Sequence, residues 1–380
     1  MSPAEWLFAA SLIILLYIYV GYPAALMILA RLMPVPVRKG KYTPTASILI
    51  AAYNEAKCIG KTIENKLALD YAGDKIEIIV ISDGSDDGTD DIVRKYENRG
   101  VRLVRQEPRA GKTSALNLAV PRARGEIIVF SDANSLYESD AILKLLANFK
   151  DPGVGYVTGK MIYMNPDGSV TGDGCSAYMK YENRLRTLET AVGSVVGVDG
   201  GIDAVRKALY RPMRADQLPD FVLPLDVVAQ GYRAVYEPGA FLRETALAEA
   251  SDEYRMRVRV SLRAFWALKD MRHLLSFRRN ALYAWQLWSH KVLRYLSFVF
   301  LVGAYIGNAL LVPEAAFYAF LFTMQTLGYA VGLAAPLASN RGFRLAHMIH
   351  YFVLINVAAL HAFWKFVSGQ KQLVWTPRKG

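Results

Sequence analysis

Apolar residues are concentrated at the two ends of this 380-residue chain, and a mixed polar and apolar segment lies between them. The first run, from Trp6 to Ala30, carries no charged residue over about 25 positions, enough to cross a hydrocarbon core of roughly 30 Å. A cleaved signal peptide is the alternative, but the run is longer than the apolar part of such a peptide and no basic segment precedes it. The pattern therefore predicts an N-terminal transmembrane helix within residues 1–31.

Two further uncharged runs lie near the C-terminus, Tyr295–Val312 and Ala315–Asn340, with only two residues between them. This spacing favours a transmembrane hairpin within residues 292–340. A fourth apolar segment, Leu345–Val367, contains three histidines and an asparagine, which are costly in lipid. We therefore expect residues 341–380 to form an interfacial helix and a cytoplasmic tail, with a fourth span as the alternative.

Basic residues flank the predicted spans on one side. Arg31 and Arg38 follow the first span, and Lys291 and Arg294 precede the second. Because short cytoplasmic flanks collect Lys and Arg, this pattern predicts a multi-pass protein of the inner (plasma) membrane whose middle segment is cytoplasmic.

The net charge of +11 raises the question of nucleic-acid binding, and the position of the charge answers it. Residues 255–294 hold ten basic residues and one acid, interspersed with tryptophans and leucines. This composition is typical of basic amphipathic helices that lie on anionic lipid, and we assign them to residues 251–291. Membrane lipids, and no nucleic acid, are the partners expected for this segment.

Short β-type runs alternate with helical patterns between residues 44 and 250. The runs are Ala46–Ala52, Glu77–Ser82, Val101–Arg105 and Glu126–Ser131. Strands that alternate with helices predict an α/β domain with a parallel-rich, Rossmann-like sheet covered on both faces. Cys58 and Cys175 show no paired spacing, as expected for a reduced cytoplasmic domain.

Polar clusters follow three of these strands: Tyr53-Asn54-Glu55, Asp83 to Gly88, and Asp132-Ala133-Asn134. Each cluster alone is also explained as a turn or a helix cap. Because ligands bind beyond the carboxyl ends of the strands in such sheets, the three clusters together indicate a ligand site. The chain has no G-x-G-x-x-G after the first strand and no complete P-loop, which argues against a dinucleotide-binding dehydrogenase and a P-loop ATPase.

These motifs resemble a known family in their order and spacing. Ser47–Glu55, Val80–Ser85, Gly111–Asn117 and Asp132–Asn134 are similar to the family-2 inverting glycosyltransferases, which have the GT-A fold. The resemblance covers roughly residues 44–270, and membrane-bound members include chitin-oligosaccharide, hyaluronan and cellulose synthases. It implies a cytoplasmic GT-A domain at residues 44–250, with transmembrane and interfacial helices around it.

The resemblance implies a donor site for a nucleotide-sugar. Tyr53 and Asp83 would hold the base and Glu55 the ribose, while Lys112 would lie on the donor side. A ring that stacks on Tyr53 and a carboxylate that accepts an N–H from the base favour a uridine diphosphate donor.

The resemblance also implies a metal site and a general base. Asp132 and Asn134 occupy the family's D-x-D position, which holds Mg²⁺ or Mn²⁺ against the diphosphate, although Asn134 contributes no charge. Asp220 would take the proton from the acceptor hydroxyl. We expect Asp220 in a loop framed by Pro219 and Pro224, and a helix N-cap is the alternative role.

Further segments match the family more loosely. Residues Gly200, Gly201, Asp203 and Arg206 resemble the acceptor-side loop. The arginines Arg257, Arg259 and Arg263 lie where the synthases keep a Q-x-x-R-W motif, and the resemblance implies that they steady the diphosphate. The Gln and Trp of that motif are missing here. A lipid-facing basic helix is the alternative explanation for these arginines. The resemblance implies that Trp375, in the C-terminal tail, covers the donor from the cytoplasmic side.

Together these features predict a hexosyl- or N-acetylhexosaminyl-transferase that acts at the inner face of a membrane, in the synthesis of a cell-surface polysaccharide. Its partners would be a nucleotide-sugar, a glycan or lipid-linked acceptor, and membrane lipids. Self-association and export partners stay open. The alternative is a non-catalytic subunit of an export assembly, which Asn134 and the altered arginine motif favour.

Overall fold

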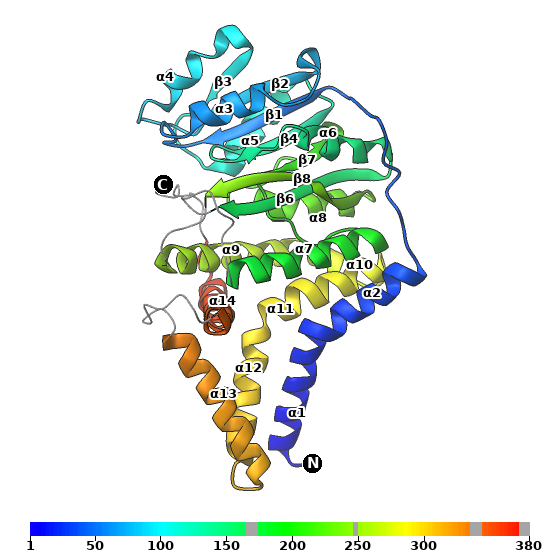
Figure 1. Cartoon of the computed structure of the whole chain (residues 1–380), viewed down its shortest axis with the longest axis vertical. Coiled ribbons are helices and arrows are strands. Elements are labelled where there is room, and N and C mark those ends of the chain that lie inside the picture. The colour runs from blue at the N-terminus through cyan, green and yellow to red at the C-terminus, as the bar shows by residue number, and fades with distance from the viewer. Residues whose placement is uncertain (165–173, 246–249, 335–343, 372–380) are drawn as a thin grey trace.

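The computed structural model describes residues 1–164, 174–245, 250–334 and 344–371. An α/β domain lies at one end of the molecule, and long apolar helices extend from its lower face, as Figure 1 shows. Trp375 lies outside the described residues.

The four predicted strands are confirmed and form one half of an eight-stranded sheet. They are β1 Ala46–Ala52, β2 Ile76–Ser82, β3 Val101–Arg105 and β4 Ile127–Asp132. The other strands are β5 Leu136–Tyr137, β6 Val154–Met164, β7 Asp203–Arg206 and β8 Arg233–Thr245. The strand order is β3-β2-β1-β4-β7-β6-β8-β5. The first four strands pair in parallel, whereas β7 runs antiparallel to both β4 and β6, so the sheet is mixed.

Both faces of the sheet are covered, as the apolar character of β1 requires. Leu49 points into one core while Ile48 and Ile50 point into the other, because successive side chains of a strand alternate between faces. The first core is closed by α5 Lys112–Ala119, α8 Pro219–Ala229 and α9 Ala250–Asp270. The second core is closed by α3 Ile59–Leu67, α4 Thr89–Arg94 and α6 Ala141–Leu146.

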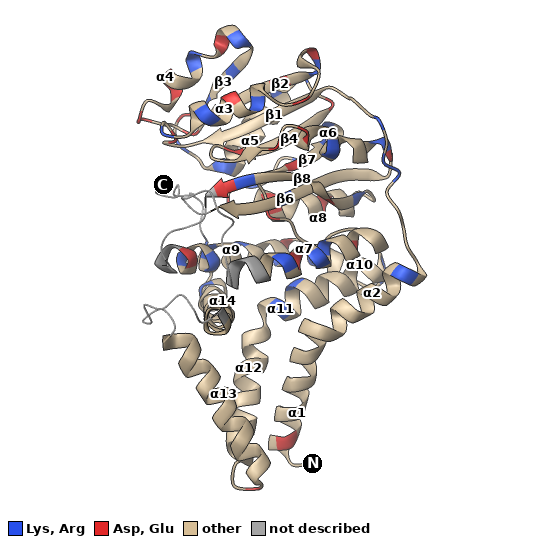
Figure 2. Cartoon of the chain, in the orientation of Figure 1, with Lys and Arg blue, Asp and Glu red and all other residues tan. Residues whose placement is uncertain are grey.

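The apolar ends of the chain form helices that point away from this domain. These are α1 Pro3–Leu16, continued by a π-helical turn at Tyr17–Gly21 into α2 Tyr22–Leu32, then α12 Ser297–Leu311 and α13 Ala316–Ala334. Their surfaces carry almost no Lys, Arg, Asp or Glu, in contrast to the helices directly above them (Figure 2). The charged residues thus lie on the domain side of these helices, and the cytoplasmic orientation stays a prediction.

By length and hydropathy, three helices among the described residues could cross a membrane: Pro3–Leu32, Ala316–Ala334 and Leu345–Val367. A fourth candidate is the pair Ala281–Tyr295 and Ser297–Leu311, which is bent by 58° at its break. In Figure 1, α14 Arg344–Val367 is seen nearly end-on, across the direction of α1, α12 and α13. That direction supports the proposal that α14 lies along the membrane surface.

A buried polar junction ties the apolar helices to the α/β domain. Helix α7 Gly174–Val192 packs under the sheet and contributes Glu182 and Glu189, which are 3% and 0% exposed. Tyr22 of α2 donates a hydrogen bond to Glu189 at 2.7 Å, and the ring of His290 lies between the two carboxylates, 2.6 Å from Glu189 and 3.2 Å from Glu182. Arg294 pairs with Glu182 at 2.5 Å. We call these five residues the buried junction.

Candidate active site

The centre of the site is the side chain of Lys112, at the start of α5. Its ammonium lies 2.6 Å from Asp132 Oδ1, at the end of β4, and 3.7 Å from Asp220 Oδ1, in the first turn of α8. Burial alone would lower the pKa of Lys112, but the two carboxylates outweigh it and hold that pKa above its ordinary value. The structure therefore gathers three predicted residues from distant parts of the sequence around one point.

Asp220 lies in a helix rather than in the predicted loop. Helix α8 begins at Pro219, and Pro224 is inside it, so both prolines are helical. The N-cap is Leu218, and no side chain makes a capping bond there, so the alternative role of Asp220 as the cap is also wrong. Burial raises the pKa of the Asp220 carboxyl, and Lys112 opposes that rise. A raised pKa suits a carboxylate that must accept a proton.

Gly200 packs its backbone directly against Asp220. Its φ is +82°, and a Cβ built there would lie 2.9 Å from the Asp220 carboxyl carbon. Gly201, with φ of +80°, accepts a hydrogen bond on its carbonyl from Tyr137 at 2.7 Å. These two glycines let the loop before β7 approach the carboxylate more closely than any other residue type would allow.

Asp203 and Arg206 lie at opposite ends of β7. Asp203 pairs with Phe130 near the carboxyl end of β4, and is 0% exposed beside Asp220. Burial, with a contribution from Asp220, raises the pKa of Asp203 to about 8, so this carboxyl is neutral at pH 7.

Arg206 pairs with Ile127 at the far end of β4, and its guanidinium donates to the carbonyls of Phe149, Val154 and Asp151. The structure therefore does not bring Arg206 to the acceptor side, because its position at the other end of the strand gives it a packing role.

Asp83 anchors the loop that leads into α5. Its carboxylate accepts hydrogen bonds from Gln106 Nε2 at 2.5 Å and from the backbone N–H groups of Ala110 and Gly111 at 2.8 and 2.9 Å. The guanidinium of Arg109, in the same loop, stacks 3.4 Å from the centre of the Tyr53 ring. Tyr53 and Asp83 thus lie together, as predicted, and Arg109 is a neighbour that sequence reasoning missed.

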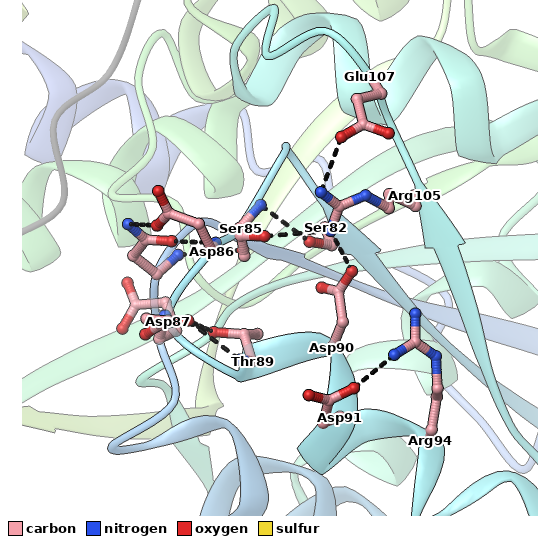
Figure 3. A network of polar contacts seen from close by, with 12 residues as sticks. Ser82, Ser85, Asp86, Asp87, Thr89, Asp90, Asp91, Arg94, Arg105 and Glu107 are labelled. Carbon is pink, nitrogen blue, oxygen red and sulfur yellow. Dashed lines mark hydrogen bonds and ion pairs between the residues drawn. The ribbon is translucent and has the colours of Figure 1, made fainter.

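The loops after β1 and β2 are joined by a polar network, part of which is drawn in Figure 3. Asn54 donates from its backbone N–H to Ser85 Oγ and from its side-chain Nδ2 to Asp86 Oδ1 at 2.8 Å, and its Oδ1 accepts from the backbone N–H of Asp86 at 3.0 Å. The backbone N–H of Glu55 donates to Thr89 at 2.9 Å. These bonds join the two loops that carry the predicted donor-binding residues and hold the backbone of Glu55.

The segment Asp132-Ala133-Asn134 contacts Glu244 of β8. Asn134 Nδ2 donates to Glu244 Oε1 at 3.1 Å, and Glu244 is 4% exposed. The side chains of Asp132, Asn134 and Glu244 contain oxygen atoms, the ligands that Mg²⁺ and Mn²⁺ prefer, so these residues fit a divalent cation. Among the described residues no group of three or more His, Cys, Asp or Glu is placed to hold a metal ion.

Of the three predicted arginines of α9, Arg263 and Arg257 have different surroundings. Arg263 is buried, donates to the carbonyl of Gln217, and is near enough to Asp220 to oppose the rise of its pKa. Arg257 pairs with Glu253 at 2.8 Å and donates to Tyr351 of α14, on the membrane side. Arg259 is half-buried on the same helix. Only Arg263 has described contacts beside the Lys112 group.

Residues 47–202 match the family model described as Glycosyl transferase family 2. The chain therefore carries a family-2 glycosyltransferase domain on a GT-A sheet, flanked by helices that are candidates to span a membrane.

Curated relatives of the chain make a bacterial polysaccharide. This chain is 28% identical over 270 residues to the poly-beta-1,6-N-acetyl-D-glucosamine synthase of Staphylococcus aureus strain COL. The match covers 66% of this chain and 64% of that protein. The chain thus spans slightly less than two thirds of that relative. The enzyme of the same name from Staphylococcus epidermidis is 25% identical over 300 residues, covering 74% and 71%.

A solved structure shares the fold over nearly the whole chain. The mannosyltransferase PcManGT from Pyrobaculum calidifontis, in complex with GDP-Man and Mn²⁺, has a TM-score of 0.74 at 21% identity, and the match covers 96% of this chain and 99% of that chain. The shared fold includes the membrane-side helices as well as the sheet, because so little of either chain is left out.

Proposed function

We propose that this protein is an inverting glycosyltransferase that moves a sugar from a nucleotide-sugar, favoured as a UDP-sugar, to a glycan or lipid-linked acceptor at the inner face of the membrane. The product would belong to a cell-surface polysaccharide. The observation that carries the proposal is the convergence of Asp132, Lys112 and Asp220 at one edge of a family-2 domain. A non-catalytic subunit would not need the ammonium of Lys112 between the carboxylates of Asp132 and Asp220.

In this mechanism Asp220 accepts the proton of the acceptor hydroxyl while the oxygen attacks the anomeric carbon from the face opposite the nucleotide. The bond from that carbon to the phosphate oxygen breaks, and the nucleoside diphosphate leaves with the electron pair. A single displacement of this kind inverts the anomeric configuration. Gly200 fixes the position of the Asp220 carboxylate, and Lys112 supplies positive charge next to the leaving diphosphate.

Asp132, Asn134 and Glu244 are the residues that would hold a divalent cation. When bound, Mg²⁺ or Mn²⁺ neutralises the negative charge that develops on the diphosphate. Glu244 provides the negative charge that Asn134 lacks, so the D-x-N sequence is compatible with a metal-dependent enzyme.

The decisive experiment is release of nucleoside diphosphate from a panel of UDP- and GDP-sugars by the purified protein in native lipid. Mg²⁺, Mn²⁺ and chelator are compared, alongside Asp132→Ala and Asp220→Asn. We expect cation-dependent turnover of one donor, abolished by both substitutions. If no donor turns over under any condition, the protein is instead a nucleotide- or lipid-binding subunit.

A further inference from the structure

Helix α3 packs against the turn that carries two of the proposed cation ligands. Asp132 and Asn134 belong to this turn, which is closed by a hydrogen bond from the backbone N–H of Ser135 to the carbonyl of Asp132 at 3.2 Å. Thr62 and Lys66 of α3 contact the turn, and each is only 1% exposed. Buried polar side chains require hydrogen-bond partners, so the partners of these two residues indicate what they do.

The two side chains bind the backbone on either side of Asn134. Thr62 Oγ1 donates to the carbonyl of Ala133 at 2.5 Å. Lys66 Nζ donates to the carbonyl of Ser135 at 2.6 Å. Because Thr62 and Lys66 are four positions apart, they lie on the same face of α3. One helix face therefore holds the backbone immediately before and after a proposed cation ligand.

Within the part of the chain that the structure describes, the hydrogen-bond and ring partners of the Lys66 side chain are all uncharged. Besides the Ser135 carbonyl, Nζ donates to Asn65 Oδ1 at 3.0 Å and lies 3.4 Å from the centre of the Tyr137 ring. Burial holds the pKa of Lys66 well below its ordinary value, and the negative charge of Asp132 opposes that shift. A neutral amine still carries N–H groups, so Lys66 remains a hydrogen-bond donor to the turn in either protonation state.

The same helix is also connected to the loop of the proposed general base. Asn65 Nδ2 donates to the carbonyl of Tyr137, and Asn65 Oδ1 accepts from the backbone N–H of Tyr137, both at 2.8 Å. The Tyr137 hydroxyl donates to the carbonyl of Gly201 at 2.7 Å. Gly201 follows Gly200, which packs against Asp220. Helix α3 therefore fixes the cation turn relative to the rest of the site.

We propose that Thr62 and Lys66 are positioning residues for the divalent cation, because they hold the turn Asp132–Ser135 in the conformation that presents its oxygen ligands. Neither side chain would touch the cation itself. This inference rests on the proposed glycosyltransferase function and adds to it the support of the cation site. Hydrogen bonds that orient metal ligands from outside the coordination sphere typically change metal affinity by about 10- to 100-fold.

The test measures Mn²⁺ binding to the full-length protein in native lipid, by electron paramagnetic resonance of free Mn²⁺ in the presence of UDP or GDP. Lys66→Met keeps a long unbranched side chain without the donor, and Thr62→Val keeps the shape without the hydroxyl. We expect each to raise the dissociation constant for Mn²⁺ about tenfold. Thr62→Ser retains the hydroxyl and should bind Mn²⁺ as the wild type does. The matched control is Lys61→Met, because Lys61 is exposed on the same helix.

Urea unfolding of each variant separates positioning from packing. If Thr62 and Lys66 only stabilise α3, their loss lowers the free energy of unfolding and leaves the dissociation constant of the folded protein for Mn²⁺ unchanged, which overturns the proposal. An equal loss of affinity in Thr62→Ser or Lys61→Met overturns it as well. If Lys66→Met does not fold, the comparison of Thr62→Val with Thr62→Ser decides alone.

The two proposals fail separately. Donor turnover by the wild type, with the same Mn²⁺ affinity in Thr62→Val and Lys66→Met, would remove only the positioning role. Mn²⁺ binding that depends on Lys66 and on the Thr62 hydroxyl, without turnover of any donor, would keep the positioning role and remove the proposed reaction. If the wild type binds no Mn²⁺ with either nucleotide, the positioning role is refuted whether or not a donor turns over.

Discussion

Replacing Gly200 by alanine tests whether the backbone of this loop positions Asp220. The new Cβ would lie 2.9 Å from the carboxyl carbon, whereas ordinary contacts begin at 3.4 Å, so the carboxylate or the loop must move by about 0.5 Å. A displacement of about 1 Å can cost roughly 100-fold in rate, so we expect kcat to fall by about 10- to 100-fold. The KM for the donor should change by less than about twofold, because Gly200 lies beside the base and not beside the Asp83 pocket.

Gly231→Ala is the matched control for backbone strain. Gly231 has φ of +90°, and a Cβ there meets nothing within 4 Å. In both variants the free energy of unfolding, measured by chemical denaturation, should fall by about 1–2 kcal/mol, because a non-glycine residue is strained in the left-handed region. Only Gly200→Ala should lose kcat in steady-state assays of nucleoside diphosphate release. If the two variants keep the same kcat, Gly200 does not position the base and the reasoning is refuted.

Three further predictions concern charge in the site. Lys112→Met removes the cation that lowers the pKa of Asp220, so the acid limb of kcat/KM should move up by about 1–3 pH units; an unmoved limb would show that Lys112 does not tune the base. The folded-state pKa of Asp203 is raised to about 8, so between about pH 4 and pH 8 this residue ionises in the unfolded chain but not in the fold, and the folded state loses stability as the pH rises. Asp203→Asn should therefore gain stability over wild type between pH 5 and pH 8, by up to about 4 kcal/mol in denaturant titrations, and a difference that does not depend on pH would contradict the assignment. Glu244→Gln should weaken Mn²⁺ binding roughly tenfold and Asn134→Asp should tighten it, by electron paramagnetic resonance of free Mn²⁺ in the presence of nucleoside diphosphate; unchanged affinity in both would remove this pair from the metal site.

The first half of the sheet could be predicted because β1 to β4 are short apolar runs, each followed by turn residues. The second half could not, and β8 shows why. It contains Pro238 and Gly239, which argue against a strand interior. In the structure the pairing of β8 with β6 jumps from Tyr236 to Phe241, so these residues lie in an irregularity of the strand.

The chemistry of the site was more predictable than its geometry. Asp132, Lys112 and Asp220 were identified from motif order, and the structure gathers them. Pro219 and Pro224 indicated a loop, but Pro219 takes the first position of α8, where its missing N–H costs nothing. Glu244 carried no local signal, since only the fold of β8 brings it to Asn134, 110 positions away along the chain.

The buried junction also fixes the position of the α/β domain relative to the apolar helices. Separating Glu182 or Glu189 from the partners of these carboxylates would strand a buried charge at a cost of about 3–5 kcal/mol, so the α/β domain cannot swing away from its helical base. Asp220 therefore keeps a fixed position relative to the apolar helices. If the proposed reaction is correct, an acceptor must bring its reactive hydroxyl to this fixed position of Asp220.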